Sequence, residues 1–292
     1  KGYRQTVRQR TLTPSVQGSN PCSPAKLSTS EEVLFSLYCN RNSKTEAYKE
    51  SEGMAYSFSG RVRYSEIGEN GLLTLPGILN YFQDCSTFQS EEVGLGIDIL
   101  KEWKRIWVLS AWQVIVERYP YMGEEIRIST WAYGFRGFMG MRNFTMETEG
   151  GERLAYANTF WTYINAENGL PVRLEEKDTE GYIGKEGKFE TKLEMNYAPR
   201  KIVIPEKCEN QESFTVQKHH LDTNHHVNNS QYVQMAMDYL PEGFQIRQMR
   251  AEYKQQARLN DIIYPSRATN EEKITILLND QKGEPYAIVE FE

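Results

Sequence analysis

The chain has 292 residues, of which 39% are hydrophobic and 12% aromatic, and its formal net charge at pH 7 is −6. This composition can supply a core for one large domain or two ordinary ones, whereas the negative charge argues against nucleic acid as a partner. No apolar run approaches the roughly 20 residues that a membrane-spanning helix needs, so the sequence predicts no membrane span.

The four cysteines form neither a CxxC pair nor the regular spacing of a disulfide framework. They are scattered along the chain at Cys22, Cys39, Cys85 and Cys208. Scattered cysteines are typical of a reduced compartment, and we therefore expect a cytoplasmic protein.

Residues 1–53 are rich in polar and basic side chains and lack any sustained helical or strand period. We expect a disordered leader, or a segment foreign to the native protein, with the natural chain beginning at Met54. An organelle transit peptide is the alternative. It fits the serine and basic content of the segment but not its five glutamates.

The first patterned stretch, residues 62–84, predicts a strand, a polar turn and then an apolar helix. Strand-like runs rich in β-branched and aromatic residues follow at 106–117, 125–133, 140–149 and 155–165. Five apolar residues of this half are candidates for a hydrophobic binding pocket, namely Ile78, Leu79, Phe82, Trp107 and Trp112. The alternative is that they form the core packed on the sheet.

A charged, proline-containing stretch at 171–212 is the predicted linker, and after it the same order of elements returns. At an offset of 154 residues, Ile67 aligns with Leu221 and Asn70 aligns with Asn224, each in a turn before an apolar helix. Further strand-like runs lie at 245–257, 262–269, 273–279 and 285–291. A long helix against an antiparallel sheet, present twice, predicts an α+β fold with domains at 54–170 and 213–292.

All four histidines fall in one window of the second copy, between His219 and His226, which also contains Asp222 and Asn224. Histidine exchanges protons near neutral pH, and a nearby carboxylate can orient its ring. The alternation of Asp222, Asn224 and His226 places the three side chains on one face if the backbone is extended. The first copy has Gly68 and Leu72 at the positions of Asp222 and His226, so only the second copy is expected to be catalytic.

The helix that follows this window should begin near Val227, Asn228 and Asn229. The first N–H groups of a helix lack intrahelical partners and favour negative charge, so these three backbone N–H groups are candidates to bind an oxyanion. Two alternatives stay open for the polar residues of the window. They could be turn formers and helix caps, or, less compatibly with their spacing, ligands of a zinc ion.

Two sequence motifs resemble those of a known family, one from Asp222 to Tyr232 and one from Glu252 to Ala257, and a third from Gly169 to Arg173 is weaker. They resemble the acyl-acyl carrier protein (acyl-ACP) thioesterases of plants and bacteria, which are tandem hot-dog folds. The resemblance covers the chain from about Phe58 to its end. It implies hydrolysis of the thioester between a fatty acyl chain and acyl carrier protein, which ends chain elongation by releasing free fatty acid.

The resemblance also implies roles for individual residues. His226 would be the catalytic histidine, and Asp222 and Asn224 would be its polar partners. Plant members carry Glu and Cys where this chain has Gln256 and Ala257. Since alanine cannot attack a thioester and glutamine cannot accept a proton, we expect direct attack by water, with Gln256 at most positioning that water. No cofactor or metal is expected, because the phosphopantetheine arm belongs to the substrate.

The implied partners are acyl carrier protein and a fatty acyl chain, with the protein a monomer or a homodimer. An acidic carrier protein would need a local basic patch on this acidic chain. The candidates are Arg136, Arg142, Arg200, Lys201, Arg250, Lys254 and Arg258. The competing functions are those of an acyl-CoA thioesterase, a hydroxyacyl dehydratase of the hot-dog fold, and a non-catalytic acyl-binding module.

Overall fold

A computed structural model describes residues 55–184, 187–270 and 273–292. The predicted leader at 1–53 and the predicted start at Met54 lie outside the described residues. The first half contains strand β1 (Tyr56–Arg61), helix α2 (Leu75–Glu92), helix α3 (Ile97–Glu102) and strands β2 (Arg105–Val116), β3 (Glu125–Arg136), β4 (Met139–Thr148) and β5 (Arg153–Asn165). The four long strands predicted for this half are confirmed.

The second half contains a shorter helix and a similar set of strands. These are strands β6 (Glu209–Asn210) and β7 (Phe214–Thr215), helix α4 (Asn229–Met237) and strands β8 (Gln248–Tyr253), β9 (Ile262–Asn270), β10 (Lys273–Asn279) and β11 (Pro285–Phe291). Across both halves, the described residues also contain four short 3-10 helices in the connections, at Tyr64–Glu66, Glu176–Asp178, Glu180–Tyr182 and Lys218–His220. The four strands predicted after position 245 are also confirmed.

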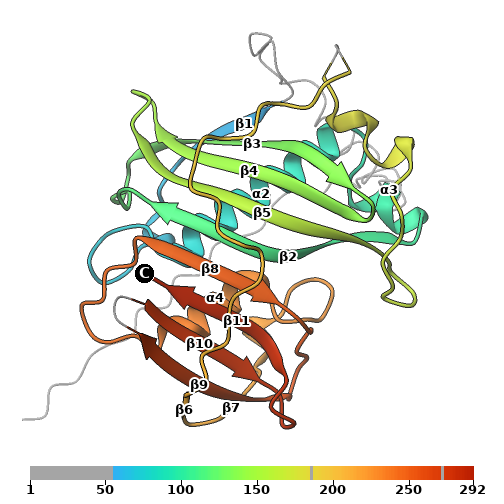
Figure 1. Ribbon diagram of the computed structural model, residues 1–292. Helices are drawn as coiled ribbons and strands as arrows, with labels where there is room; N and C mark the ends of the chain where they lie inside the picture. The colour runs from blue at the N-terminus through green and yellow to red at the C-terminus, as the bar shows by residue number, and fades with distance from the viewer. Residues whose placement is uncertain (1–54, 185–186, 271–272) are drawn as a thin grey trace, which may run out of the picture. The chain divides into compact units, whose positions relative to one another are not determined.

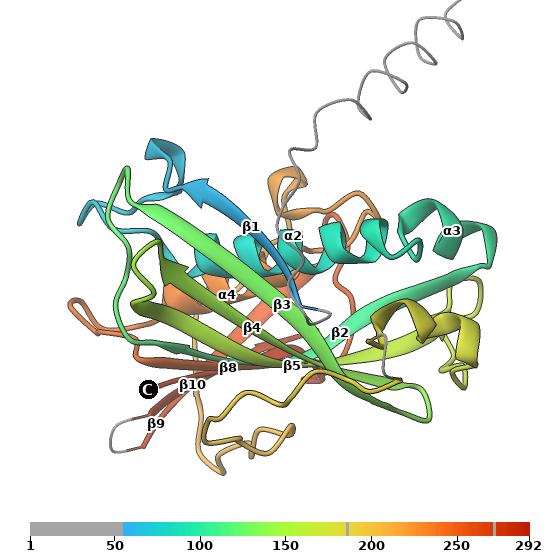
Figure 2. The same ribbon diagram turned by 90° about the horizontal axis from the view of Figure 1, so that it is seen from above.

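The strands form one antiparallel sheet in the order β1-β3-β4-β5-β2-β8-β11-β10-β9-β6, with β7 paired to β9 (Figure 1). The pairing of β2 with β8, in which Trp112 lies opposite Ala251, joins the strands of the two halves. Helices α2 and α4 lie on the same face of this sheet and contact each other (Figure 2). The α+β fold class predicted from the sequence is confirmed.

Side-chain alternation along the strands separates the two faces of the sheet. Trp112 and Val114 of β2 point into a hydrophobic core shared by both halves, while Gln113 between them points to the opposite face. There Gln113 donates to the carbonyl of Asn196 and accepts from the N–H of Ala198, both at 2.8 Å. Part of the predicted linker therefore lies on the sheet face opposite the helices.

None of the helices in the described ranges is both long and apolar enough to cross a membrane.

Candidate active site

The histidine window folds into a tight loop. Leu221 and Val227 form an antiparallel bridge at its base, and the N–H of Asp222 donates to the carbonyl of His226 at 2.8 Å. Asp222 Oδ1 accepts hydrogen bonds from the N–H groups of Asn224 at 2.8 Å and His226 at 3.2 Å. The prediction of one extended face for the three polar residues is therefore wrong, because the Asp222 carboxylate turns the backbone back on itself.

The same loop occurs 154 residues earlier in the chain. Ile67 and Leu73 form the equivalent bridge, and the N–H of Gly68 donates to the carbonyl of Leu72 at 2.9 Å. Helix α2 begins one residue after its cap Thr74, just as α4 begins one residue after Asn228, again 154 residues apart. The predicted internal repeat is thus confirmed in the backbone of the loop and in the start of the following helix, although the first copy lacks the acid and the imidazole.

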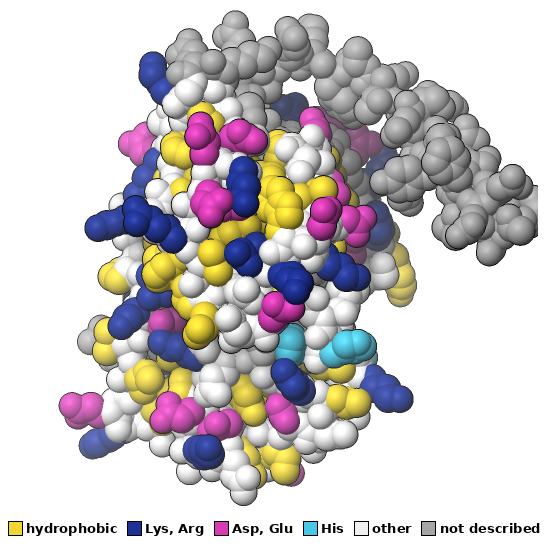
Figure 3. All heavy atoms as spheres, turned by 90° about the vertical axis from the view of Figure 1, so that its right-hand side faces the viewer, with side chains coloured by type: hydrophobic (Ala, Val, Ile, Leu, Met, Phe, Trp, Pro, Cys, Tyr) yellow, Lys and Arg dark blue, Asp and Glu magenta, His cyan; other side chains and the backbone are white. Residues whose placement is uncertain are grey.

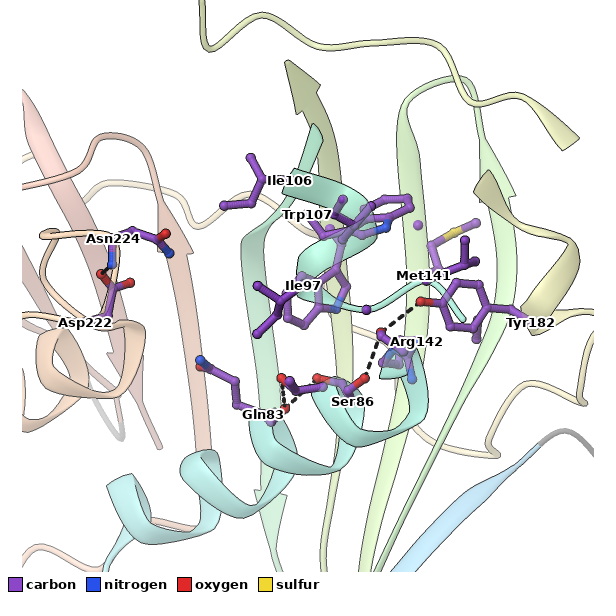
Figure 4. A pocket seen from close by; sticks show the side chains of 18 of the residues that line it. Gln83, Ser86, Ile97, Ile106, Trp107, Met141, Arg142, Tyr182, Asp222 and Asn224 are labelled. Atoms are coloured by element: carbon purple, nitrogen blue, oxygen red, sulfur yellow. Dashed lines mark hydrogen bonds between the residues drawn. The ribbon is translucent and has the colours of Figure 1, made fainter. Parts of the chain in front are cut away.

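A cavity of about 440 Å³ lies between the two halves of the described chain. Strands β2 to β5, helices α2 and α3, and Tyr182 form most of its wall, and the second half contributes Asp222, Thr223, Asn224 and Asn228. Its large apolar lining residues are Leu95, Ile97, Leu100, Ile106, Trp107, Phe135, Met141 and Trp161. Figure 4 shows Asp222 and Asn224 on one side of this cavity, across from the side chains of α2 and of strands β2 and β4. The sequence-predicted loop and an apolar pocket are therefore brought together.

His226 is half-buried and does not line the cavity. Burial lowers its pKa, the positive charges of Arg258 and His225 lower it further, and the Asp222 carboxylate opposes them. The neutral imidazole, which can accept a proton, is therefore favoured. Within the described ranges, no group of three or more His, Cys, Asp or Glu residues is arranged to hold a metal ion.

Two of the three predicted oxyanion donors already have partners. The N–H of Val227 donates to the carbonyl of Ala257 at 3.0 Å, and the N–H of Asn228 donates to the carbonyl of His220 at 2.9 Å. These two N–H groups anchor the loop and are not available to a substrate. The N–H of Asn229, the first residue of α4, has no partner among the described residues and stays a candidate.

Gln256 and Ala257 occupy very different environments. The side chain of Gln256 is exposed and does not line the cavity, so a water held by it would lie outside the pocket. Ala257 is completely buried in the core. Its N–H donates to the hydroxyl of Tyr232 at 2.8 Å, while its carbonyl accepts from the N–H of Val227. The backbone at Ala257 therefore ties the loop to helix α4.

Of the five candidate pocket residues, only Trp107 lines the cavity, where its ring packs against those of Phe135 and Tyr163. The other four, Ile78, Leu79, Phe82 and Trp112, lie in the hydrophobic core. The reason is that the apolar stripe of α2 faces the sheet. The cavity is bounded instead by a polar stripe of the same helix, Gln83, Ser86, Thr87 and Ser90, whose helical spacing is visible in the sequence.

The loop reaches the surface beside basic side chains. Figure 3 shows histidine side chains on one face of the molecule with Lys and Arg side chains next to them, and all four histidines belong to this segment. Of the candidate basic residues, Arg142 is buried and Arg250 is paired with Glu290 at 2.8 Å, so neither is available for docking. Arg136, Lys201 and Arg258 are exposed, and Arg200 is half-buried. Lys254 is also exposed but is paired with Glu252 at 2.6 Å.

Two family models match the chain, the acyl-ACP thioesterase N-terminal domain over residues 53–182 and the C-terminal domain over residues 205–291. The chain belongs to the acyl-ACP thioesterase family. It is 23% identical over 229 residues to an acyl-[acyl-carrier-protein] hydrolase of Cuphea viscosissima and 22% identical over 232 residues to oleoyl-acyl carrier protein thioesterase 1 of Arabidopsis thaliana. Both alignments cover 73% of this chain, but only 54% and 63% of the plant proteins, both of which are described as chloroplastic.

Two solved structures of the same family share the fold. An acyl-ACP thioesterase from Bacteroides thetaiotaomicron superposes with a TM-score of 0.73 at 20% identity, covering 82% of this chain and 97% of that one. The 12:0-ACP thioesterase from Umbellularia californica superposes with a TM-score of 0.71 at 17% identity, covering 84% and 98%. The tandem hot-dog fold expected from the sequence is therefore confirmed.

Proposed function

We propose that this chain hydrolyses the thioester of fatty acyl-ACP and releases the free fatty acid. One observation carries the proposal: a cavity built mostly by the first half, with apolar and polar side chains in its wall, is also lined by Asp222 and Asn224 of the second half. An acyl chain in that cavity would bring its thioester to a carboxylate and an amide. The membership of the family supports the same reaction.

In the proposed reaction a water molecule attacks the thioester carbonyl carbon directly. Because its Oδ1 is occupied by two backbone N–H groups, Asp222 would receive the water proton on its other oxygen. The amide of Asn224 would hold the water or the carbonyl oxygen, and the N–H of Asn229 is the remaining backbone candidate for the oxyanion. Collapse of the tetrahedral intermediate then breaks the carbon–sulfur bond, and the proton taken from the water passes to the departing sulfur, which leaves as the phosphopantetheine thiol.

His226 does not line the cavity, so it would act on the proton held by Asp222 and not on the substrate directly. Its backbone is hydrogen-bonded to Asp222 at both the N–H and the carbonyl, so its ring follows the position of the acid. In the neutral form it would take up the proton that Asp222 receives, as a second acceptor. In this arrangement His226 is required for activity although it does not contact the acyl chain.

The test is turnover of acyl-ACP of several chain lengths, with release of free fatty acid as the readout. A well-placed base contributes about 10² to 10⁴ in rate and one oxyanion donor about 10² to 10³, so His226→Ala and Asn224→Ala should each lower kcat strongly. Gln256→Ala, whose side chain is exposed and outside the cavity, is the matched control and should keep wild-type activity. Acyl-CoA of equal length separates the two thioester classes. Acyl binding without hydrolysis of any thioester would indicate a non-catalytic acyl-binding module instead.

We also propose that one chain suffices and that acyl carrier protein docks near the exposed Arg258. Both halves of the cavity come from the same polypeptide, and strand β8 is already paired to β2 within it. Docking of an acidic carrier protein through basic side chains predicts that KM rises with ionic strength. Light scattering during size-exclusion chromatography measures the mass of the active species.

A further inference from the structure

The cavity contains a group of polar side chains at the end away from the loop. Figure 4 shows Asp222 and Asn224 on one side of the pocket, and Met141, Arg142 and Tyr182 on the opposite side. Ser90 of helix α2 links two parts of this group, because its hydroxyl donates to the carbonyl of Ser86 at 2.9 Å and lies 2.8 Å from the hydroxyl of Tyr182. A cavity that held only alkyl chains would not need polar groups there.

Arg142 is the centre of this group. Strand β4 carries it into the cavity wall, where the residue is only 7% exposed. Its Nη1 donates to the side chains of Gln89 and Thr130, and its guanidinium carbon lies 5.3 Å from the centre of the Tyr182 ring. No carboxylate within the described ranges forms an ion pair with it. Buried arginines are ordinarily paired with an acid, so this one is exceptional.

The remaining N–H groups of Arg142 have no hydrogen-bond partner among the described residues. A guanidinium has five N–H donors, and both of its hydrogen bonds to described side chains come from Nη1. The fully enclosed side-chain atoms without a partner in the described ranges are Trp112 Nε1 and Asn279 Oδ1. Nε and Nη2 of Arg142 are neither bonded there nor fully enclosed, and Arg142 lines the cavity, so we infer that these two atoms face it. Burial also lowers the pKa of this guanidinium, so an anion beside it would relieve the cost of the buried charge.

We propose that Arg142 binds an oxygen-bearing group on the acyl chain, so that the preferred substrates carry a carboxylate, oxo or hydroxyl group distant from the thioester. This inference rests on the proposed thioesterase function and names its substrate class. Nε and Nη2 form the fork that binds a carboxylate with two parallel hydrogen bonds, so a chain ending in a carboxylate is the best fit. Tyr182 and Ser90 supply hydroxyl groups close by.

The competing explanation is that Arg142 only braces helix α2 against the sheet through Gln89 and Thr130. A brace would affect all substrates alike, whereas a recognition residue affects only those that carry the oxygen. Three acyl-ACP substrates of equal chain length separate these readings: unsubstituted, hydroxylated near the chain end, and carboxylated at the chain end. The measured quantity is the ratio of kcat/KM values for the substituted and unsubstituted substrates.

We expect the wild-type protein to prefer the carboxylated chain by about 10-fold or more, since hydrogen bonds to charged groups contribute that much selectivity. Arg142→Met should abolish the preference, and Arg142→Lys, which keeps the charge but loses the fork, should retain part of it. Arg127→Met, an exposed arginine on neighbouring strand β3, is the matched control and should leave the ratio unchanged. A wild-type preference for the unsubstituted chain, or equal losses on all three substrates in Arg142→Met, would overturn the proposal.

A binding measurement makes the inference independent of turnover and of the folding of any variant. Calorimetric titration of the wild-type protein compares a medium-length dicarboxylic acid with the monocarboxylic acid of equal length. Tighter binding of the diacid supports Arg142 as a receptor even if no thioester is hydrolysed, in which case only the proposed activity falls. Equal or weaker binding of the diacid removes this inference while leaving hydrolysis of plain acyl chains untouched.

Discussion

His225 adopts the same left-handed backbone conformation as Gly71, which lies 154 residues earlier, with φ values of 62° and 74°. In both loops the N–H of this residue donates to the carbonyl three residues before it, at 3.1 Å in the second copy and 2.9 Å in the first. Glycine adopts this conformation without strain, whereas a histidine must be held there. The hydrogen bonds of the loop therefore maintain this conformation even where the residue is a histidine, as at the proposed active site.

Replacing Gly71 with alanine should destabilise the protein through its backbone alone. Nothing lies within 4 Å of the position that the new Cβ would occupy, so no steric clash contributes. We expect a loss of about 1 kcal/mol in the free energy of unfolding, measured by urea denaturation. Gly150→Ala is the control, because Gly150 has no positive φ and its Cβ would meet only Thr148 at 3.7 Å. Equal effects of the two substitutions would show that φ is not the cause.

Asp222→Asn should separate the structural role of this residue from its chemical role. The asparagine oxygen can still accept from the N–H groups of Asn224 and His226, so the loop should keep its shape. The proton acceptor is lost, and we expect kcat to fall about 10²- to 10⁴-fold with little change in the unfolding midpoint. Asp222→Ala removes both functions and should also lower the unfolding free energy by about 1 kcal/mol. Full activity of Asp222→Asn would exclude the carboxylate as the base.

The pH dependence of stability should report on His226. Burial and Arg258 lower its pKa in the folded protein, so the unfolded chain binds more protons as the pH falls through its ordinary pKa of about 6.5. Stability from this group is therefore present above that pH and is lost on acidification. Burial also lowers the pKa of His220, which acts in the same direction. Denaturant midpoints at pH 5 and pH 7.5 should differ less in His226→Gln than in the wild-type protein; an unchanged difference would contradict the lowered pKa.

Most of the sheet could be predicted because each long strand has one face in the core. The alternation in Glu125–Arg136 marks that face directly in the sequence. Strand β1 and helix α3 were not predicted. Each has only six residues, Tyr56–Arg61 and Ile97–Glu102, and neither contains a fully buried residue. Both elements depend on tertiary contacts, β1 on its pairing with β3 and α3 on its packing against β2.

The site could be predicted only in part, for a related reason. Asp222 and Asn224 stand out because their chemistry is concentrated in one short loop. The rest of the cavity is assembled from segments far apart in sequence, such as Arg142 and Tyr182. Sequence analysis assigns Arg142 to a docking surface, because an arginine is ordinarily exposed. The apolar face of α2 packs in the core, and this packing decides which face of the helix lines the cavity. No local sequence pattern predicts that outcome.

Introducing cysteine at position 257 should not create a covalent enzyme. The side chain of Ala257 is fully buried in the core, and only its backbone reaches the loop, through the carbonyl that accepts from Val227. A thiol there would not meet the thioester carbonyl, and burial would also raise its pKa, as it does for buried Cys85, which disfavours the reactive thiolate. Ala257→Cys should therefore hydrolyse acyl-ACP at or below the wild-type rate. Intact-mass measurement after single-turnover incubation should find no acyl adduct beyond any that the wild-type protein forms. An acyl group on the new cysteine, located by peptide mapping, would show that the loop opens far enough to bring position 257 to the substrate.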